Sequence, residues 1–90
     1  MNKYKVQYKQ RLVTRNEAIR KNAFSCITFE NIGDDDATIN NVIPLPANAY
    51  EVREFNEHPS TIIDSQFEVR FSGKSPNQRV LIIEAYYYSI

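Results

Sequence analysis

The sequence has one cysteine, two glycines, no tryptophan and only short apolar runs. Cys26 has no partner for an internal disulfide, so we expect a fold that depends on neither disulfides nor a cysteine-based metal site. The longest clean apolar run, Val80–Ile83, is far shorter than the ~20 residues of a membrane-spanning helix. Residues 1–11 contain lysines but lack the apolar segment of a secretory signal. We therefore expect neither a signal peptide nor a transmembrane segment, and no membrane partner.

Residues for enzyme chemistry are also scarce. The only histidine, His58, precedes Pro59 in a polar turn, where a solvated residue is a better interpretation than a catalytic base. Two glycines are too few for the usual phosphate-binding loops, and Asp34–Asp36 lacks the spacing of a calcium loop and is interpreted as a solvated turn. Paired-carboxylate catalysis stays open, since any two acids can meet in space, but no pair stands out. We predict a non-enzymatic protein with no catalytic, metal-binding or cofactor-binding residues.

The apolar residues that are present favour strands. Isoleucine and valine together number sixteen and the aromatic residues eleven, against three leucines, six alanines and one methionine. β-branched and aromatic side chains suit a pleated sheet, whereas leucine, alanine and methionine suit helices. Ninety residues are enough for one small domain. We expect a single all-β domain over residues 1–90.

Alternation of apolar and polar residues locates the expected strands. The predicted strands are 3–9, 24–29, 37–43, 49–55, 61–64, 66–71 and 79–89. The residues predicted to face inward in the two clearest cases are Tyr4, Val6, Tyr8, Phe67, Val69 and Phe71. Short strands joined by polar turns predict an antiparallel β-sandwich or a jelly-roll-like small barrel of about seven to eight strands.

Residues 15–22 fit two structures. Thr14 and Glu17 match a capping box, which predicts one short helix in this segment. A hairpin with Leu12 and Ile19 on its two arms fits the same residues. Both interpretations stay open at the level of sequence.

The net charge of zero hides a division of the chain. Residues 1–21 carry seven basic residues and one acid, and residues 22–90 carry four basic residues and ten acids, so the net charges are +6 and −6. We interpret the first segment as a basic N-terminal arm or strand and the second as an acidic β-sandwich body. Lys5, Lys9 and Arg11 share one parity and would form a charged stripe on a strand. We interpret this stripe as a solvated face or as a surface that docks onto the acidic body of a neighbouring copy, rather than as a nucleic-acid-binding surface.

The last strand is apolar on both faces. Its even-numbered residues from Val80 to Tyr88 are apolar except for Glu84, and its odd-numbered residues from Leu81 to Tyr87 are all apolar. We therefore expect both faces of this strand to be covered by other parts of a protein. Two interpretations remain open: a central strand, or a strand whose Tyr86, Tyr87 and Tyr88 belong to a subunit interface, where tyrosine is enriched.

The middle of the chain resembles a known family. The segments that carry the resemblance are Ile27–Gly33, Ala37–Asn40 and Ile43–Pro46. They are similar to the strand-and-turn pattern of small virion structural proteins from tailed phages and prophages of Bacteroidetes-like hosts. The resemblance covers residues 24–72. The usual turn glycine is missing, and Asn48 is expected to supply the left-handed conformation there instead.

The resemblance implies a small β-sandwich in a virion, as a head-decoration, head–tail or tail component, assembled in the host cytoplasm with copies of itself and other virion proteins. It carries no site residues. Two alternatives remain. A carbohydrate- or host-surface-binding module would expose Tyr50 and the three C-terminal tyrosines in a groove, and a small nucleic-acid-binding or regulatory module would use the basic arm.

Overall fold

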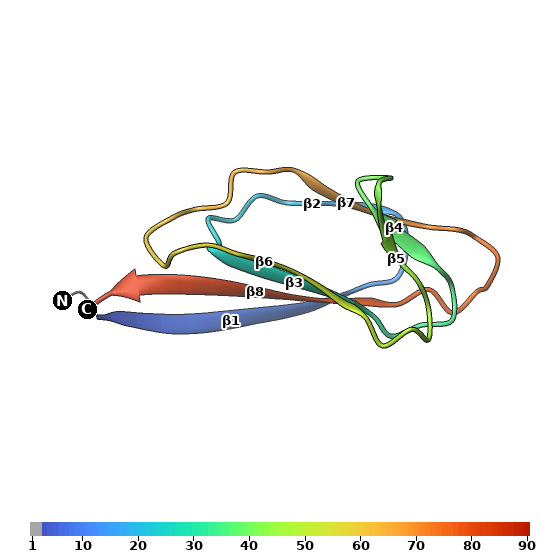
Figure 1. Ribbon diagram of the computed structural model, residues 1–90, viewed down its shortest axis with the longest axis horizontal. Helices are drawn as coiled ribbons and strands as arrows, with labels where there is room; N and C mark the ends of the chain where they lie inside the picture. The colour runs from blue at the N-terminus through green and yellow to red at the C-terminus, as the bar shows by residue number, and fades with distance from the viewer. Residues whose placement is uncertain (1–2) are drawn as a thin grey trace.

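Two antiparallel sheets of four strands each face one another in the computed structural model, which describes residues 3–90 (Figure 1). The strands are β1 (Tyr4–Val13), β2 (Glu17–Ile19), β3 (Cys26–Asn31), β4 (Ala37–Ile39), β5 (Ile43–Leu45), β6 (Val52–Asn56), β7 (Phe67–Phe71) and β8 (Val80–Ser89). Sheet A has the order β1-β8-β3-β6 and sheet B the order β2-β7-β4-β5. The prediction of an all-β sandwich is confirmed, and no helix occurs within residues 3–90.

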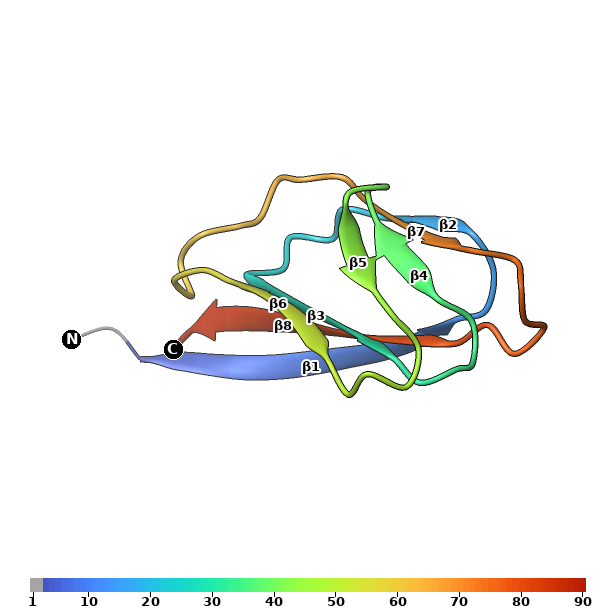
Figure 2. The ribbon, with the colours of Figure 1, turned by 45° about the vertical axis from the view of Figure 1, so that its right-hand side comes forward.

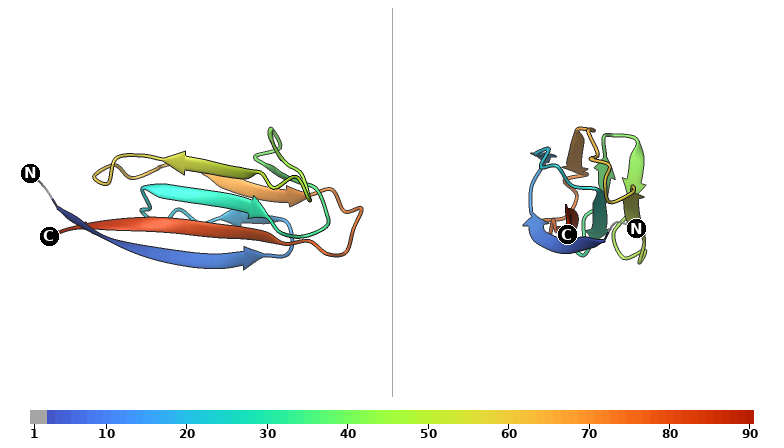
Figure 3. Two further views of the ribbon diagram at one scale, coloured as in Figure 1. Left: turned by 60° about the horizontal axis from the view of Figure 1, so that its bottom comes forward. Right: turned by 90° about the vertical axis from the view of Figure 1, so that its left-hand side faces the viewer.

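The first and last strands form the longest pair. β1 and β8 are paired from Tyr4 opposite Ser89 to Val13 opposite Val80. Both termini therefore lie at one end of the molecule, which measures 49 × 21 × 17 Å. The strands of sheet B are shorter, and the β1–β8 ribbon extends past them toward the termini (Figures 1 and 3). The part of this ribbon near the termini thus has no strand of sheet B opposite it (Figures 1 and 3).

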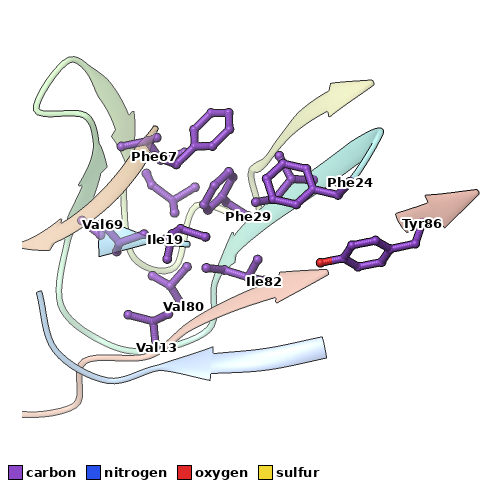
Figure 4. Close-up of a cluster of buried hydrophobic side chains, with 13 residues drawn as sticks. Val13, Ile19, Phe24, Phe29, Phe67, Val69, Val80, Ile82 and Tyr86 are labelled. Atoms are coloured by element: carbon purple, nitrogen blue, oxygen red, sulfur yellow. The ribbon is translucent and has the colours of Figure 1, made fainter. Parts of the chain in front are cut away.

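Aromatic and β-branched side chains from both sheets fill the space between them (Figure 4). The ring of Phe29 in β3 lies 5.5 Å from that of Phe67 in β7, and Phe55 in β6 lies 5.1 Å from Phe67. Phe67 and Val69 point inward and Phe71 packs at the edge of the core, as their alternation predicts. Burial of this apolar area is the main force that holds the sheets together.

The predictions for residues 15–22 are both wrong. Glu17–Ile19 forms β2, which pairs with β7 in sheet B rather than with β1 in sheet A. The chain therefore crosses between the sheets, and Figure 2 shows this turn at the end of the sandwich. Val13 and Ile19, on either side of the crossing, are both buried. Burial of these two side chains between the sheets favours the crossing over a hairpin within one sheet.

Two strand predictions also need correction. The predicted strand 37–43 is a hairpin of β4 and β5, because Asn40 and Asn41 both have positive φ, 55° and 60°, and turn the chain. Residues 61–64 form no strand. The expectation for Asn48 is confirmed, since its φ is 58°.

The acidic run Asp34–Asp36 is only in part a solvated turn. Asp34 and Asp36 are exposed, but the interpretation is wrong for Asp35, which holds two loops together. Asp35 is buried, 1% exposed, and its carboxylate binds the loop before β8. Its donors are the Ser72 hydroxyl, the Gly73 and Lys74 amides at 2.9 and 3.2 Å, and the Gln78 amide group at 3.0 Å. These bonds hold the β3–β4 loop against the β7–β8 loop.

Gly33 brings the same two loops into backbone contact. Its amide donates to the Arg79 carbonyl at 3.1 Å. A Cβ at this position would collide with the Asn77 carbonyl and the Arg79 amide. One of the two glycines of the chain is thus needed for close approach.

Candidate interaction surface

The outward face of sheet A carries an uncovered apolar surface. Val13 is fully buried, and because side chains alternate along a strand, the odd-numbered residues of β1 face inward and the even-numbered ones outward. Val6 and Tyr8 are 41% and 61% exposed. The prediction that Tyr4, Val6 and Tyr8 point into the core is therefore wrong, although Tyr4 is half-buried with its ring edge-on to His58 at 6.1 Å.

The apolar side chains continue from β1 across to β8. In the register of this pair, Val6 lies opposite Tyr87 and Leu12 opposite Leu81. We call the set the outer stripe. Its members are Val6, Tyr8, Leu12, Leu81, Ile83 and Tyr87. All six are exposed or half-buried, and none belongs to the buried core.

Charged residues are almost absent from this face. By the registers of β1, β8, β3 and β6, the only charged outward-facing positions in the strands of sheet A are Glu30 and Glu54. Glu30 of β3 lies opposite Leu81, at the border of the outer stripe, and Glu54 lies one strand further away on β6. A surface of this composition suits an apolar partner and offers nothing to bind phosphate.

The three C-terminal tyrosines do not lie on one face of sheet A. Tyr86 points between the sheets, with its ring 6.4 Å from that of Phe24, and it is buried (Figure 4). Its assignment to a subunit interface is wrong, because it completes the core of its own chain. Tyr87 lies on the outer stripe. Tyr88 is 51% exposed and donates its hydroxyl to the Gln7 side chain at 3.3 Å.

A buried carboxylate lies beside Tyr86. Glu84 is buried on the inner face of β8 and accepts a hydrogen bond from the Tyr86 hydroxyl. Burial raises the pKa of Tyr86 above its usual range, and the hydrogen bond to Glu84 adds to the shift. The Lys9 ammonium lies 4.7 Å from the centre of the Tyr86 ring, a cation–π contact.

The predicted charged stripe exists but faces inward. Lys5, Lys9 and Arg11 lie on the opposite face of β1 from the outer stripe. Arg11 pairs with Glu17 of the same basic segment. Lys5 and Lys9 make no ion pair with any residue from Lys3 onward. Of the two interpretations of the basic segment, arm or strand, the strand is observed, since residues 4–13 form β1 and residues 17–19 form β2.

A cavity lies at the end of the sandwich near the termini. Its volume is 590 Å³, and its walls include Lys9, Asn22, Ile62 and all three C-terminal tyrosines. Tyr50 is elsewhere, in the β5–β6 loop, 97% exposed and with a positive φ of 56°. The groove expected of a carbohydrate-binding module, with all four tyrosines together, does not form.

Fold and surface together define a small antiparallel β-sandwich with one uncovered apolar face. Comparison of the chain with protein-family models, curated proteins and solved structures gives no match. In the described part of the chain no helix has the length and apolar character to span a membrane. No group of three or more histidine, cysteine, aspartate or glutamate side chains among residues 3–90 is arranged to hold a metal ion.

Proposed function

We propose that this chain is a non-enzymatic structural protein that assembles with copies of itself through the outer stripe of sheet A. The observation that carries the proposal is the uncharged, apolar outward face shared by β1 and β8. Monomeric proteins rarely leave a contiguous apolar patch of this kind open to water. Covering it in an assembly removes apolar area from solvent and stabilises the complex.

A second copy fits the outer stripe better than a charged partner. The stripe runs along the strands, so a two-fold axis that lies parallel to the sheet, between the two copies, places one stripe over the other. Sheets packed in this way lie about 10 Å apart and align their strands to within about 30°. The two carboxylates of the face, Glu30 on β3 and Glu54 on β6, lie outside the outer stripe, although Glu30 borders it opposite Leu81. The stripe itself therefore brings no charged side chain to the contact between two copies.

The resemblance of residues 24–72 to phage virion proteins supports a more specific role. It favours a place in a virion, as a head-decoration, head–tail or tail component, with other virion proteins as further partners. A structural role of this kind needs stable surfaces and no turnover. The apolar face supplies such a surface, and the absence of an enzyme motif in the sequence agrees with a non-catalytic role.

Lysine in place of both Tyr8 and Leu12 is expected to weaken self-association by at least about 100-fold, because it places two charges at the centre of an apolar interface. Both side chains are solvent-exposed in the single chain, so the fold should persist. The measurement is sedimentation equilibrium of the variant beside the wild type, with circular dichroism to check folding.

The matched control is Val42→Lys, which alters another exposed apolar residue, 79% exposed in the β4–β5 turn. It should associate like the wild type. A Tyr8→Lys/Leu12→Lys variant that is folded and associates with unchanged affinity would show that the outer stripe is not the interface.

A further inference from the structure

The two border strands of sheet A each leave one edge unpaired. β1 is bonded only to β8, and β6 only to β3. Within residues 3–90 no backbone hydrogen bond reaches the outer edge of either strand. Free edges of this kind pair readily with another strand. Sheet A can therefore be extended from both sides.

The direction of the strands decides how two copies can join. Each strand of sheet A is antiparallel to its neighbours. In a sheet of four alternating strands, β1 and β6 run in opposite directions. When a second copy is placed beside the first in the same orientation, its β1 lies antiparallel to the β6 of the first. Copies in one orientation thus continue the alternation of the sheet without interruption.

The charges of the two edges are complementary. β1 contains three basic residues and no acid between Tyr4 and Val13. β6 carries Glu54 and is flanked by Glu51 and Glu57, and its one base, Arg53, is engaged by Glu51 at 2.8 Å. Pairing of two β1 edges would place basic residues opposite one another, which is destabilising. Pairing of β1 with β6 avoids this repulsion.

One antiparallel register joins the opposite charges directly. When Lys9 of one copy lies opposite Glu51 of the next, Lys3 lies opposite Glu57. This follows because Lys3 and Lys9 are six residues apart in the sequence, and so are Glu51 and Glu57. The same register places Tyr8 opposite Val52, both of which face outward. The apolar surface of one copy then continues onto its neighbour.

We propose that copies of this chain join head to tail, with β1 of one copy paired antiparallel to β6 of the next in this register. The inference rests on the proposed function, since it names the second contact through which the copies assemble. A head-to-tail contact uses two different surfaces, so it generates a closed ring or an open filament rather than a dimer. The outer stripe remains free in each copy for face-to-face packing.

Charge reversal on each edge tests this contact. Lys3→Glu/Lys9→Glu places acids opposite Glu51 and Glu57 in the proposed register, and Glu51→Lys/Glu57→Lys places bases opposite Lys9 and Lys3. Each variant alone should form assemblies larger than a dimer at least about 10-fold more weakly than the wild type, because like charges then oppose one another. An equimolar mixture of the two variants should recover them, and so should a chain that carries all four changes. Sedimentation velocity at low salt measures the assembly size.

The control matched to Lys3→Glu/Lys9→Glu is Arg15→Glu/Arg20→Glu. It also replaces two basic residues with two acids, at two exposed positions outside β1 and β6. It should assemble like the wild type. If the control variant loses assembly to the same extent as the edge variants, the change in net charge and not edge pairing is responsible, and the inference is wrong.

The remaining outcomes separate the inference from the proposed function. If single-edge variants assemble like the wild type while Tyr8→Lys/Leu12→Lys abolishes association, head-to-tail pairing is wrong and the proposed function stands. If Lys3→Glu/Lys9→Glu weakens assembly while Glu51→Lys/Glu57→Lys assembles like the wild type, the β6 edge takes no part in the contact and the inference is overturned. A wild type that remains monomeric overturns both.

Discussion

Replacement of Phe29 with alanine is expected to lower the free energy of unfolding by about 3–5 kcal/mol. The side chain is fully buried at the centre of sheet A. Its ring lies 6.1 Å from that of Phe55 and 5.5 Å from that of Phe67, so it joins the two sheets. A domain of this size has a total stability of about 5–15 kcal/mol. The substitution should therefore remove a large share of the total stability.

Urea unfolding followed by circular dichroism measures this loss. The control is Tyr50→Ala, which removes an aromatic ring that is 97% exposed and should change stability by less than about 0.5 kcal/mol. Equal effects of the two substitutions would contradict the position of Phe29 in the core.

Replacement of Asp35 with alanine is expected to lower the melting temperature by at least about 5 °C. The buried carboxylate is the acceptor for donors of four residues in the β7–β8 loop, two of which are the backbone amides of Gly73 and Lys74. Alanine leaves these donors without a partner. Thermal unfolding, with Asp34→Ala as the control at an exposed neighbour that accepts one hydrogen bond, measures the difference.

The same carboxylate predicts how stability depends on pH. The Ser72 hydroxyl, the amides of Gly73 and Lys74 and the Gln78 side chain hold the pKa of Asp35 below its usual value of 3.8, although burial opposes the shift. The unfolded chain therefore takes up a proton at higher pH than the folded one. The stabilisation is present above pH 3.8 and is lost as the pH falls through the lowered pKa.

Asp35→Asn tests this dependence. The variant should lose less stability than the wild type between pH 5 and pH 2, because residue 35 no longer titrates. Urea midpoints across this range are the measurement. Parallel losses in the two proteins would mean that Asp35 has the same pKa in the folded and unfolded chains.

The fold class follows from the composition, but the faces of β1 do not. The alternation in residues 3–9 correctly predicts a strand and incorrectly predicts its inward side. Apolar side chains normally mark the face that packs against another sheet. Here the ribbon extends past sheet B, so its inner face can hold Lys5 and Lys9, and Tyr8 faces solvent. The buried Val13, of opposite parity to Tyr8, is the one signal in the strand that gives the correct side.

The candidate surface was only partly predictable for the same reason. The doubly apolar last strand correctly indicates a central strand, since β8 lies between β1 and β3. Its odd positions contribute to the outer stripe, and the cover expected over them stays a prediction. Tyr86 belongs to the even positions, together with the buried Val80 and Ile82, so parity alone could have separated it from Tyr87. The burial of Asp35 had no sequence signal, because its donors lie more than thirty-five residues away along the chain.

Self-assembly is the central claim, and the molar mass of the wild-type protein in solution tests it most directly. Light scattering after size-exclusion chromatography, or sedimentation equilibrium, should be run from about 1 µM to about 500 µM. We predict a mass that rises from the 10.5 kDa of one chain to a discrete multiple or a growing filament. A mass that stays at 10.5 kDa over the whole range would contradict the account.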